Sequence, residues 1–350
     1  MKKTLAFFLV PLLLLVSCST KNYDIEPNEA NAPNSATKET DNYNPFAKDN
    51  EPLSESATVG SYGTGVEWQE GKELVLEYAP VVSFRYFVEN SGEDNDFGLM
   101  LFVNGFRQPY HTESDSENKI IHIFDVNKNE KKVQTIEFEP VVGDKGDEVS
   151  VEIVTIFNPN FIQNENSNYE FNHRITSLYP SSLNITQITG ASEPNICTNY
   201  ESTPITDETR LKFVDTSNPE INLLDNNVYI EVLKNDLFYT PEDYINSEID
   251  TQPYNKEDLI SLCMYGGEPC TYRVSMYINH ELVAGAFDGY DYIDITTSND
   301  TICKKTIDIN GLNLSLNEYN HLYFVAVPFY TNKNYGERMV IKSESATIMK

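Results

Sequence analysis

The chain has 350 residues, and its 54 acidic and 25 basic side chains give a formal net charge of −29. A surface this acidic repels nucleic acid and anionic lipid headgroups, which excludes both as ligands. The length allows two domains of ordinary size, and the hydrophobic content of 40% excludes a wholly disordered chain.

The chain begins with a secretory signal. Two lysines precede an apolar run over 5–16, which is too short to span a bilayer and matches the h-region of a signal peptide. The run ends in Leu15-Val16-Ser17-Cys18, which resembles the lipobox of bacterial lipoproteins. The resemblance implies that segment 1–17 is cleaved and that Cys18, acylated with diacylglycerol, becomes the mature N-terminus. We therefore expect a lipid-anchored protein of the cell membrane that faces outward, with an ordinary signal peptide and a chance cysteine as the alternative.

Residues 18–57 have the composition of a flexible stalk. They are dominated by Asn, Ser, Thr, Pro, Glu and Asp, and they contain few apolar positions. Such a segment buries too little surface to offset the entropy lost on ordering. A flexible chain of about 40 residues reaches on the order of 35 Å, which would lift the folded part away from the membrane.

From Thr58 onward the sequence is typical of an all-β protein. Short apolar runs rich in Val, Ile, Phe and Tyr alternate with Gly, Asn, Asp and Pro, which favours a sandwich over a βαβ fold. In Thr135-Ile136-Glu137-Phe138-Glu139 the apolar side chains share one face, as a half-buried strand requires. The predicted strands of the first half are 73–78, 81–89, 98–104, 119–124, 133–139 and 149–157.

The second half repeats this pattern. The offsets between matched segments are 175, 171 and 173 residues (274−99, 303−132 and 324−151), which chance would be unlikely to keep. The matched segments are 99–105 with 274–280, 132–138 with 303–309, and 151–159 with 324–330. We therefore expect two tandem Ig-like β-sandwich domains, 58–190 and 191–350. The alternative is that any two β-domains share such fragments.

Loop composition places the boundary between the two domains in 190–209, and Arg210 to Asp215 would open the second domain. Two segments of the second half, 241–246 and 255–262, are predicted as short helical turns. Thr240 followed by Pro241 is a suitable start for the first of them.

Four cysteines follow Cys18, all in or at the edge of the predicted second domain. An even number of cysteines outside the membrane permits two disulfides. We favour Cys263–Cys270, since Gly266, Gly267 and Pro269 can turn the chain back between them, which leaves Cys197–Cys303. Buried thiols or a metal site are the alternatives, although the wide spacing lacks the paired short gaps of zinc ribbons.

Signals for an enzyme are weak, and we expect no enzymatic activity. The five histidines form no His-Glu-x-x-His motif, and the chain contains no Gly-x-Ser-x-Gly elbow or phosphate-binding loop. His122 lies in an apolar run and is predicted as a strand residue. Clustered oxygens make Glu93, Asp94 and Asp96 the best candidates for a Ca²⁺ site, with solvated turns as the alternative.

Tyrosine is abundant, with 22 residues beside 18 Phe and one Trp. Exposed aromatic side chains supply rigid contact area for a protein or glycan partner. On this argument the candidate ligand-contacting residues are Tyr290 and Tyr292, which share a face of an extended strand, and Phe106 and Tyr110, which flank the Asn104-Gly105 turn. The alternative is that tyrosine simply favours strands.

Together these features predict a non-enzymatic surface lipoprotein that acts as an adhesion or protein-interaction module. A carbohydrate-binding lipoprotein of a polysaccharide system is the alternative. Because Ig-like sandwiches host many functions, the step from fold to role rests on analogy.

Overall fold

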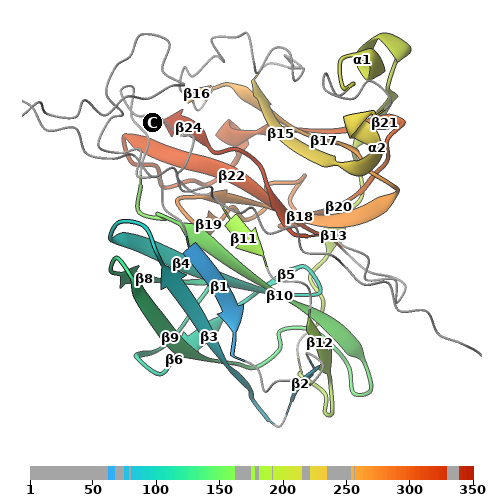
Figure 1. Cartoon of the computed structure of the whole chain (residues 1–350). Helices are drawn as coiled ribbons and strands as arrows, with labels where there is room; N and C mark the ends of the chain where they lie inside the picture. Colours follow the sequence, from blue (N-terminus) through green and yellow to red (C-terminus); the bar gives the residue numbers. More distant parts are fainter. Residues whose placement is uncertain are drawn as a thin grey trace, which may run out of the picture. The chain divides into compact units, whose positions relative to one another are not determined.

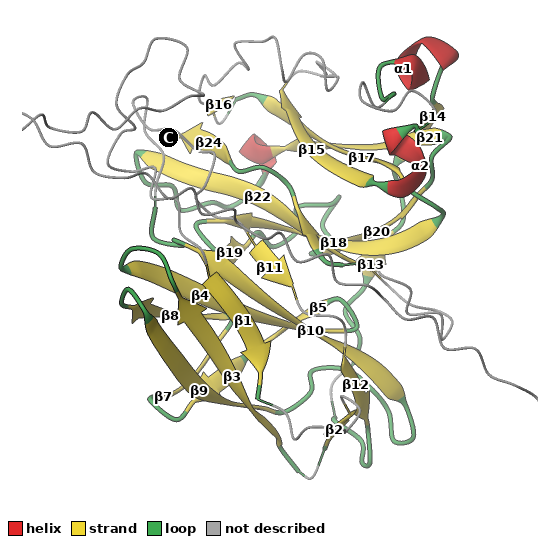
Figure 2. Ribbon diagram, in the orientation of Figure 1, coloured by secondary structure: helices red, strands yellow, loops and turns green. Residues whose placement is uncertain are grey.

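The structure is a computed structural model in which Leu53–Lys350 form one compact unit. It describes residues 62–67, 75–78, 80–161, 175–177, 181–190, 192–214, 221–234, 254–255, 257–328 and 339–350. The predicted signal peptide, Cys18 and stalk lie outside these residues. The described part is almost entirely β-structure, as the sequence predicts, and its strands form four sheets (Figures 1 and 2).

The first sandwich consists of two sheets, here called sheets A and B. Sheet A has the strand order β1-β3-β9-β6-β7, with β1 (Tyr62–Val66), β3 (Val82–Asn90), β6 (Tyr110–Thr112), β7 (Asp115–Lys119) and β9 (Glu130–Phe138). Sheet B has the order β2-β12-β10-β4-β5, with β11 beside β10 and β8 beside β4. Its strands are β2 (Val75–Glu77), β4 (Asn95–Val103), β5 (Phe106–Gln108), β8 (Ile121–Val126), β10 (Glu148–Phe157), β11 (Ile175–Ser177) and β12 (Ser181–Asn184).

Strand β3 of sheet A alternates buried and exposed side chains with a period of two residues. Along β3, Val82, Phe84 and Val88 are buried in the core between the two sheets, whereas Ser83 and Arg85 are exposed. This is the half-buried strand pattern. All six strands predicted for the first half are present, with bounds that differ by a few residues.

The second sandwich consists of sheets C and D. Sheet C has the order β13-β20-β18-β22-β24-β16, with β19 beside β18 and β23 beside β22. Its strands are β13 (Ile196–Cys197), β16 (Tyr254–Asn255), β18 (Cys270–Ile278), β19 (Glu281–Leu282), β20 (Tyr292–Thr297), β22 (Tyr319–Pro328), β23 (Ile341–Lys342) and β24 (Ala346–Met349). Sheet D has the order β14-β21-β17-β15, with β14 (Glu201–Pro204), β15 (Val228–Lys234), β17 (Leu259–Gly266) and β21 (Thr301–Asp308).

Helical structure is brief in the described part of the chain. It consists of α1 (Asp207–Leu211), α2 (Leu223–Asn226) and the 3₁₀ turn η1 (Ile309–Gly311). The helical turn predicted for 255–262 is wrong, because Ile260, Leu262 and Met264 alternate into the core as a strand requires. The turn predicted at Thr240 lies outside the described residues. None of the described helices is long and apolar enough to cross a bilayer.

The two sandwiches share one strand topology. The neighbours β1-β3-β9 correspond to β15-β17-β21, and β8-β4-β10 correspond to β20-β18-β22. The parallel pair β2–β12 corresponds to the parallel pair β16–β24. Strands β13 and β14, from the segment predicted as a boundary loop, pair with β20 and β21 of the second sandwich. The boundary between 190 and 191 stays a prediction.

The strand registers correct one detail of the repeat. Ile153 on β10 pairs with Leu101 on β4, and Phe324 on β22 pairs with Met276 on β18. If Met276 corresponds to Leu101, an offset of 175 residues (276−101), then Phe324 corresponds to Ile153, an offset of 171 residues (324−153). The predicted offset of 173 is therefore wrong by two residues. A shift of two keeps every side chain on its own face, so the apolar pattern alone does not reveal it.

Sheets B and C pack against each other through a third apolar cluster, here called the junction. It contains Met100, Phe102, Val154 and Ile156 of sheet B, and Tyr277, Tyr323, Val325, Val327 and Val340 of the second sandwich. Strands β4, β10, β18 and β22 are therefore buried on both faces. Because both faces of these strands are buried, their sequences are continuous apolar runs rather than alternating apolar and polar residues.

Candidate functional site

Three of the four predicted aromatic contact residues are buried, and that prediction is wrong for them. Phe106 is 1% exposed, Tyr110 0% and Tyr292 3%, whereas Tyr290 is 39% exposed. The Tyr110 hydroxyl donates to the Leu99 carbonyl at 2.6 Å, and burial raises the pKa of Tyr110 far above its ordinary value. The rings of Phe106 and Tyr292 meet edge to face at 5.1 Å between centroids. The Phe106–Tyr292 pair joins the two sandwiches, Tyr110 packs in the core of the first, and none of the three is exposed to a ligand.

The predicted disulfides are not formed, since the four described cysteines Cys197, Cys263, Cys270 and Cys303 are thiols. Cys197, Cys270 and Cys303 line the core between sheets C and D. Cys263 lies between the core residues Leu262 and Met264 on β17, so it points to the opposite face of sheet D. The Cys263–Cys270 pairing is excluded in this fold because the sheet separates the two side chains.

The predicted calcium loop is held together by its own contacts. The Lys128 ammonium pairs with Glu93 at 2.6 Å, and the Lys128 backbone N–H donates to Asp94 at 2.7 Å. Asp96 lies opposite Asp125 across β4 and β8, and a hydrogen bond with Asp96 raises the pKa of Asp125. Among the described residues, no three His, Cys, Asp or Glu side chains are grouped to hold a metal ion. Calcium binding here stays a prediction.

The outer face of sheet A carries exposed polar side chains in ordered pairs. We call it the open face and define it by Ser83, Arg85 and Phe87 of β3 and Thr135 and Glu137 of β9. Ser83 donates to Glu137 at 3.2 Å, and Arg85 pairs with Glu67 at 2.8 Å. These contacts hold the polar groups in fixed positions on a rigid sheet. A surface of this kind is preorganised for a partner.

Phe87 is the aromatic side chain of the open face. It is half-buried and lies across Gly65 of the neighbouring strand, where an added Cβ would approach the ring to 2.7 Å. The Lys131 ammonium lies 4.0 Å from its ring centroid, a cation–π contact. Gly65 is therefore required for the ring to lie flat on the sheet.

A concavity lies beside the open face, at the end of sheet A. Its volume is about 280 Å³, with Val81, Pro109 and Val141 on its apolar side and His111, Asn118 and Glu139 on its polar side. His111 contacts Glu137 through Nε2 and Asn118 through Nδ1, both at 3.2 Å. The imidazole thus connects the concavity with the open face.

On the corresponding face of sheet D, strand β17 is buried. The β17 residues that point away from the core, Ser261, Cys263 and Tyr265, are each at most 2% exposed. Phe213 and Leu224 pack on Tyr265, so the α2 segment covers that end of the sheet. The outer face of sheet D is thus buried along β17, although Thr306 and Asp308 of β21 are exposed, whereas on sheet A the corresponding strand β3 exposes Ser83 and Arg85.

Sequence reasoning identified the strands of the open face but did not select it as a site. The signal was present in the polar positions that alternate with the core residues of 81–89 and 133–139. Alternation alone does not say whether a polar face stays in solvent or is covered by another segment.

Comparisons with known proteins assign no family. No family model and no curated protein matches the chain. Similar solved structures include the CARDB domain of the PF1109 protein from Pyrococcus furiosus, with 11% identity, a TM-score of 0.22, and coverage of 37% of this chain and 94% of that one. A protein of unknown function from Porphyromonas gingivalis W83 has 10% identity and a TM-score of 0.21, with coverage of 82% and 99%. The CsuC–CsuE chaperone–tip adhesion subunit complex of Acinetobacter baumannii has 12% identity and a TM-score of 0.20, with coverage of 83% and 100%. At TM-scores this low, none of these likenesses carries an argument about function.

Proposed function

We propose that the protein is a non-enzymatic surface lipoprotein that acts as an adhesion or protein-interaction module and binds its partner through the open face of sheet A. A lipid on Cys18 tethers it to the membrane, and the stalk of residues 18–57 carries the two sandwiches outward. The observation that carries the proposal is the difference between two corresponding strands: the outward side chains of β17 are buried, and Ser83 and Arg85 of β3 are exposed.

The chemistry of the open face supports a protein partner. It alternates acidic, basic and hydroxyl side chains, and Phe87 supplies a flat apolar surface within them. Protein interfaces combine aromatic and arginine contacts with a polar rim in this way. Arg85 belongs to a residue type that often dominates binding energy, and Phe87 to a type that is enriched at the cores of interfaces.

The carbohydrate alternative loses its original support. It depended on exposed tyrosines, of which Tyr110 and Tyr292 are buried. The concavity beside the open face is lined by His111, Asn118 and Glu139 without an aromatic platform. We therefore keep a protein as the proposed partner and treat glycan binding as an outcome of the test.

Site-specific photo-crosslinking on intact cells tests the proposal. A photoreactive amino acid is placed at Ser83 or Arg85 on the open face, and at Glu148 or Glu201, which are exposed elsewhere. We expect adducts of one defined mass from the two open-face positions and none from the other two. Equal adducts at all four positions, or none at the open face, would refute the proposal.

A glycan array separates the two partner classes. The full-length chain is applied in detergent, with an R85A variant as the matched control. A defined glycan that binds the wild-type chain and not the variant would replace the protein partner with a carbohydrate one. Crosslinked adducts on cells, together with no binding to any glycan on the array, would support the protein partner.

A further inference from the structure

The two histidines at one end of the junction form an unusual arrangement. His280 follows β18, His321 lies on β22, and both are buried, with exposed fractions of 7% and 3%. Their Nε2 atoms are 3.2 Å apart, and the Nε2 of His280 is also 2.6 Å from the carbonyl oxygen of Pro159. Two imidazoles of the second sandwich therefore converge with a backbone oxygen of the first.

The first sandwich provides an internal reference for this site. Asn104 Oδ1 accepts a hydrogen bond from the backbone N–H of Ser150, and Asn279 Oδ1 accepts one from that of His321. His321 thus corresponds to Ser150. His280, the residue after Asn279, corresponds in the same way to Gly105, the residue after Asn104. The second sandwich carries histidine at both positions where the first has a small residue.

The backbone at His280 is strained for its residue type. Its φ is 66°, and the corresponding Gly105 adopts 77°, a left-handed conformation that glycine reaches without steric cost. A non-glycine residue held there costs on the order of 1 kcal/mol or more, and such residues gather at functional sites. The turn keeps a histidine where glycine would be the less strained choice.

One proton lies between the Nε2 atoms of His280 and His321 and the carbonyl oxygen of Pro159. A carbonyl only accepts, so the bond to Pro159 requires the Nε2–H tautomer of His280. The facing Nε2 of His321, at 3.2 Å, then presents its lone pair to the same N–H. Two imidazole nitrogens bound to one tetrahedral ion at about 2.0–2.1 Å are about 3.3 Å apart. The observed separation of 3.2 Å fits this geometry.

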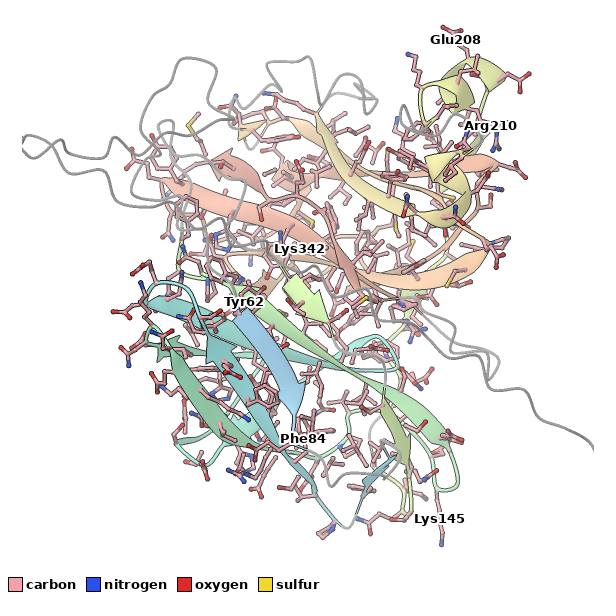
Figure 3. The ribbon with its side chains drawn as sticks, in the orientation of Figure 1. Tyr62, Phe84, Lys145, Glu208, Arg210 and Lys342 are labelled. Atoms are coloured by element: carbon pink, nitrogen blue, oxygen red, sulfur yellow. The ribbon has the colours of Figure 1, made fainter. Side chains whose placement is uncertain are left out.

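The surroundings of His280 match those of a metal ligand. Its Nδ1 is 2.7 Å from the Tyr323 hydroxyl, the kind of outer hydrogen bond that orients ligating histidines. Lys342 (labelled in Figure 3) lies 4.8 Å from the Tyr323 ring, and burial lowers its pKa to about 7. Its opposing charge therefore diminishes above neutral pH.

We propose that His280 and His321, with the carbonyl of Pro159, bind a divalent first-row transition metal such as Zn²⁺ at the junction. The metal binds the Nε2 lone pair of the other His280 tautomer, in which the ring proton has moved from Nε2 to Nδ1 and is donated to the Tyr323 hydroxyl, so the ring stays neutral and no proton is lost. A bound ion would join a residue of the first sandwich to two of the second. The proposal is independent of the partner that binds the open face.

Calorimetry on the full-length chain in detergent, stripped of metal with a chelator, tests the proposal at pH 8. We expect saturable uptake of about one Zn²⁺ per chain. Co²⁺ in place of Zn²⁺ should give a visible absorption band from the coordinated ion.

The variants of the two histidines are chosen to match the corresponding residues of the first sandwich. H280G and H321S copy Gly105 and Ser150, so each introduces a residue that the corresponding turn already accommodates. We expect each variant to lose roughly tenfold or more in Zn²⁺ affinity and to lose the Co²⁺ band, because a ligand is missing. H111N, which removes a half-buried histidine outside the junction, should bind Zn²⁺ as the wild-type chain does.

Two results would refute the proposed metal site. One is the absence of saturable Zn²⁺ uptake by the wild-type chain. The other is unchanged binding in both H280G and H321S. Circular dichroism checks that each variant is folded, and since the two variants change different strands, one folded variant is enough to decide.

Discussion

Asn104 and Asn279 make the same hydrogen bond in the two sandwiches, 175 positions apart in the chain (279−104). Both have a left-handed backbone, with φ of 47° and 51°. In each, the side-chain oxygen accepts from a backbone N–H near the start of the long strand that pairs with the preceding one, β10 or β22, at 2.9 and 3.1 Å. Asparagine tolerates this conformation better than most residues because its short polar side chain can bond locally.

Replacement of Asn104 should therefore destabilise the first sandwich in two separable steps. N104G keeps the left-handed conformation and loses only the hydrogen bond, which we expect to cost about 1 kcal/mol in the free energy of unfolding. N104A adds the strain of a non-glycine residue, for a total of about 2 kcal/mol. Urea denaturation measures both values, and equal losses in the two variants would contradict the role of backbone strain.

Arg273 should be the most costly polar side chain of the junction to remove. It donates to both carboxylate oxygens of Asp294 at 3.0 Å and to the Asn104 carbonyl at 2.8 Å, and it lies 4.1 Å from the Phe106 ring centroid. Since it is buried, R273M leaves these partners unpaired, and we expect a loss of about 3 kcal/mol in stability.

Arg85 supplies the matched control for Arg273. It also pairs with a carboxylate, Glu67 at 2.8 Å, but its side chain is 61% exposed. An exposed ion pair contributes little, so R85M should change the free energy of unfolding by no more than about 0.5 kcal/mol. Similar losses in R85M and R273M would show that burial at the junction does not matter.

Glu152 should make stability fall as the pH rises. It is fully buried on the junction face of β10, neither carboxyl oxygen has a hydrogen-bond partner among the described residues, and burial raises its pKa from 4.5 to about 8. Between these values the folded chain keeps a proton that the unfolded chain has released, so stability decreases from about pH 4.5 to about pH 8. E152Q removes this dependence.

The stability gained by E152Q over the wild-type chain should therefore grow across that window, by a few kcal/mol in total. Urea denaturation at a series of pH values measures it. E148Q, at an exposed position of the same strand, should keep the slope of the wild-type chain. A constant difference between E152Q and the wild-type chain would mean that Glu152 does not titrate differently in the folded state.

Lipidation should depend on Cys18 alone among the cysteines. Metabolic labelling with an alkyne analogue of palmitate should mark the wild-type chain and a C263S variant, since Cys263 is buried in sheet D. C18S should lose the label, and without acyl chains the mature protein should leave the membrane fraction. Label retained by C18S would refute the lipobox interpretation.

Local pattern was enough to predict the strands and the all-β class. The alternation of Val82, Phe84 and Val88 with exposed residues is visible in the sequence, because the strand period of two is set by the backbone. The Asn104 and Asn279 turns were also visible in the sequence, because each asparagine follows an apolar run and asparagine favours turns. The open face could have been selected from its polar positions, but not distinguished from a covered face.

Tertiary packing decided the rest. The sequence by itself determined which side chains share a face of a strand, and this is why Cys263 is separated from Cys270 once Leu262 and Met264 enter the core. It did not determine what each face meets. Tyr292 and Phe106 could be exposed platforms or buried contacts, and only the approach of sheet C to sheet B made them buried. The contact of His280 with the Pro159 carbonyl depends on the same approach, because residues 121 positions apart meet without any local signature in the sequence.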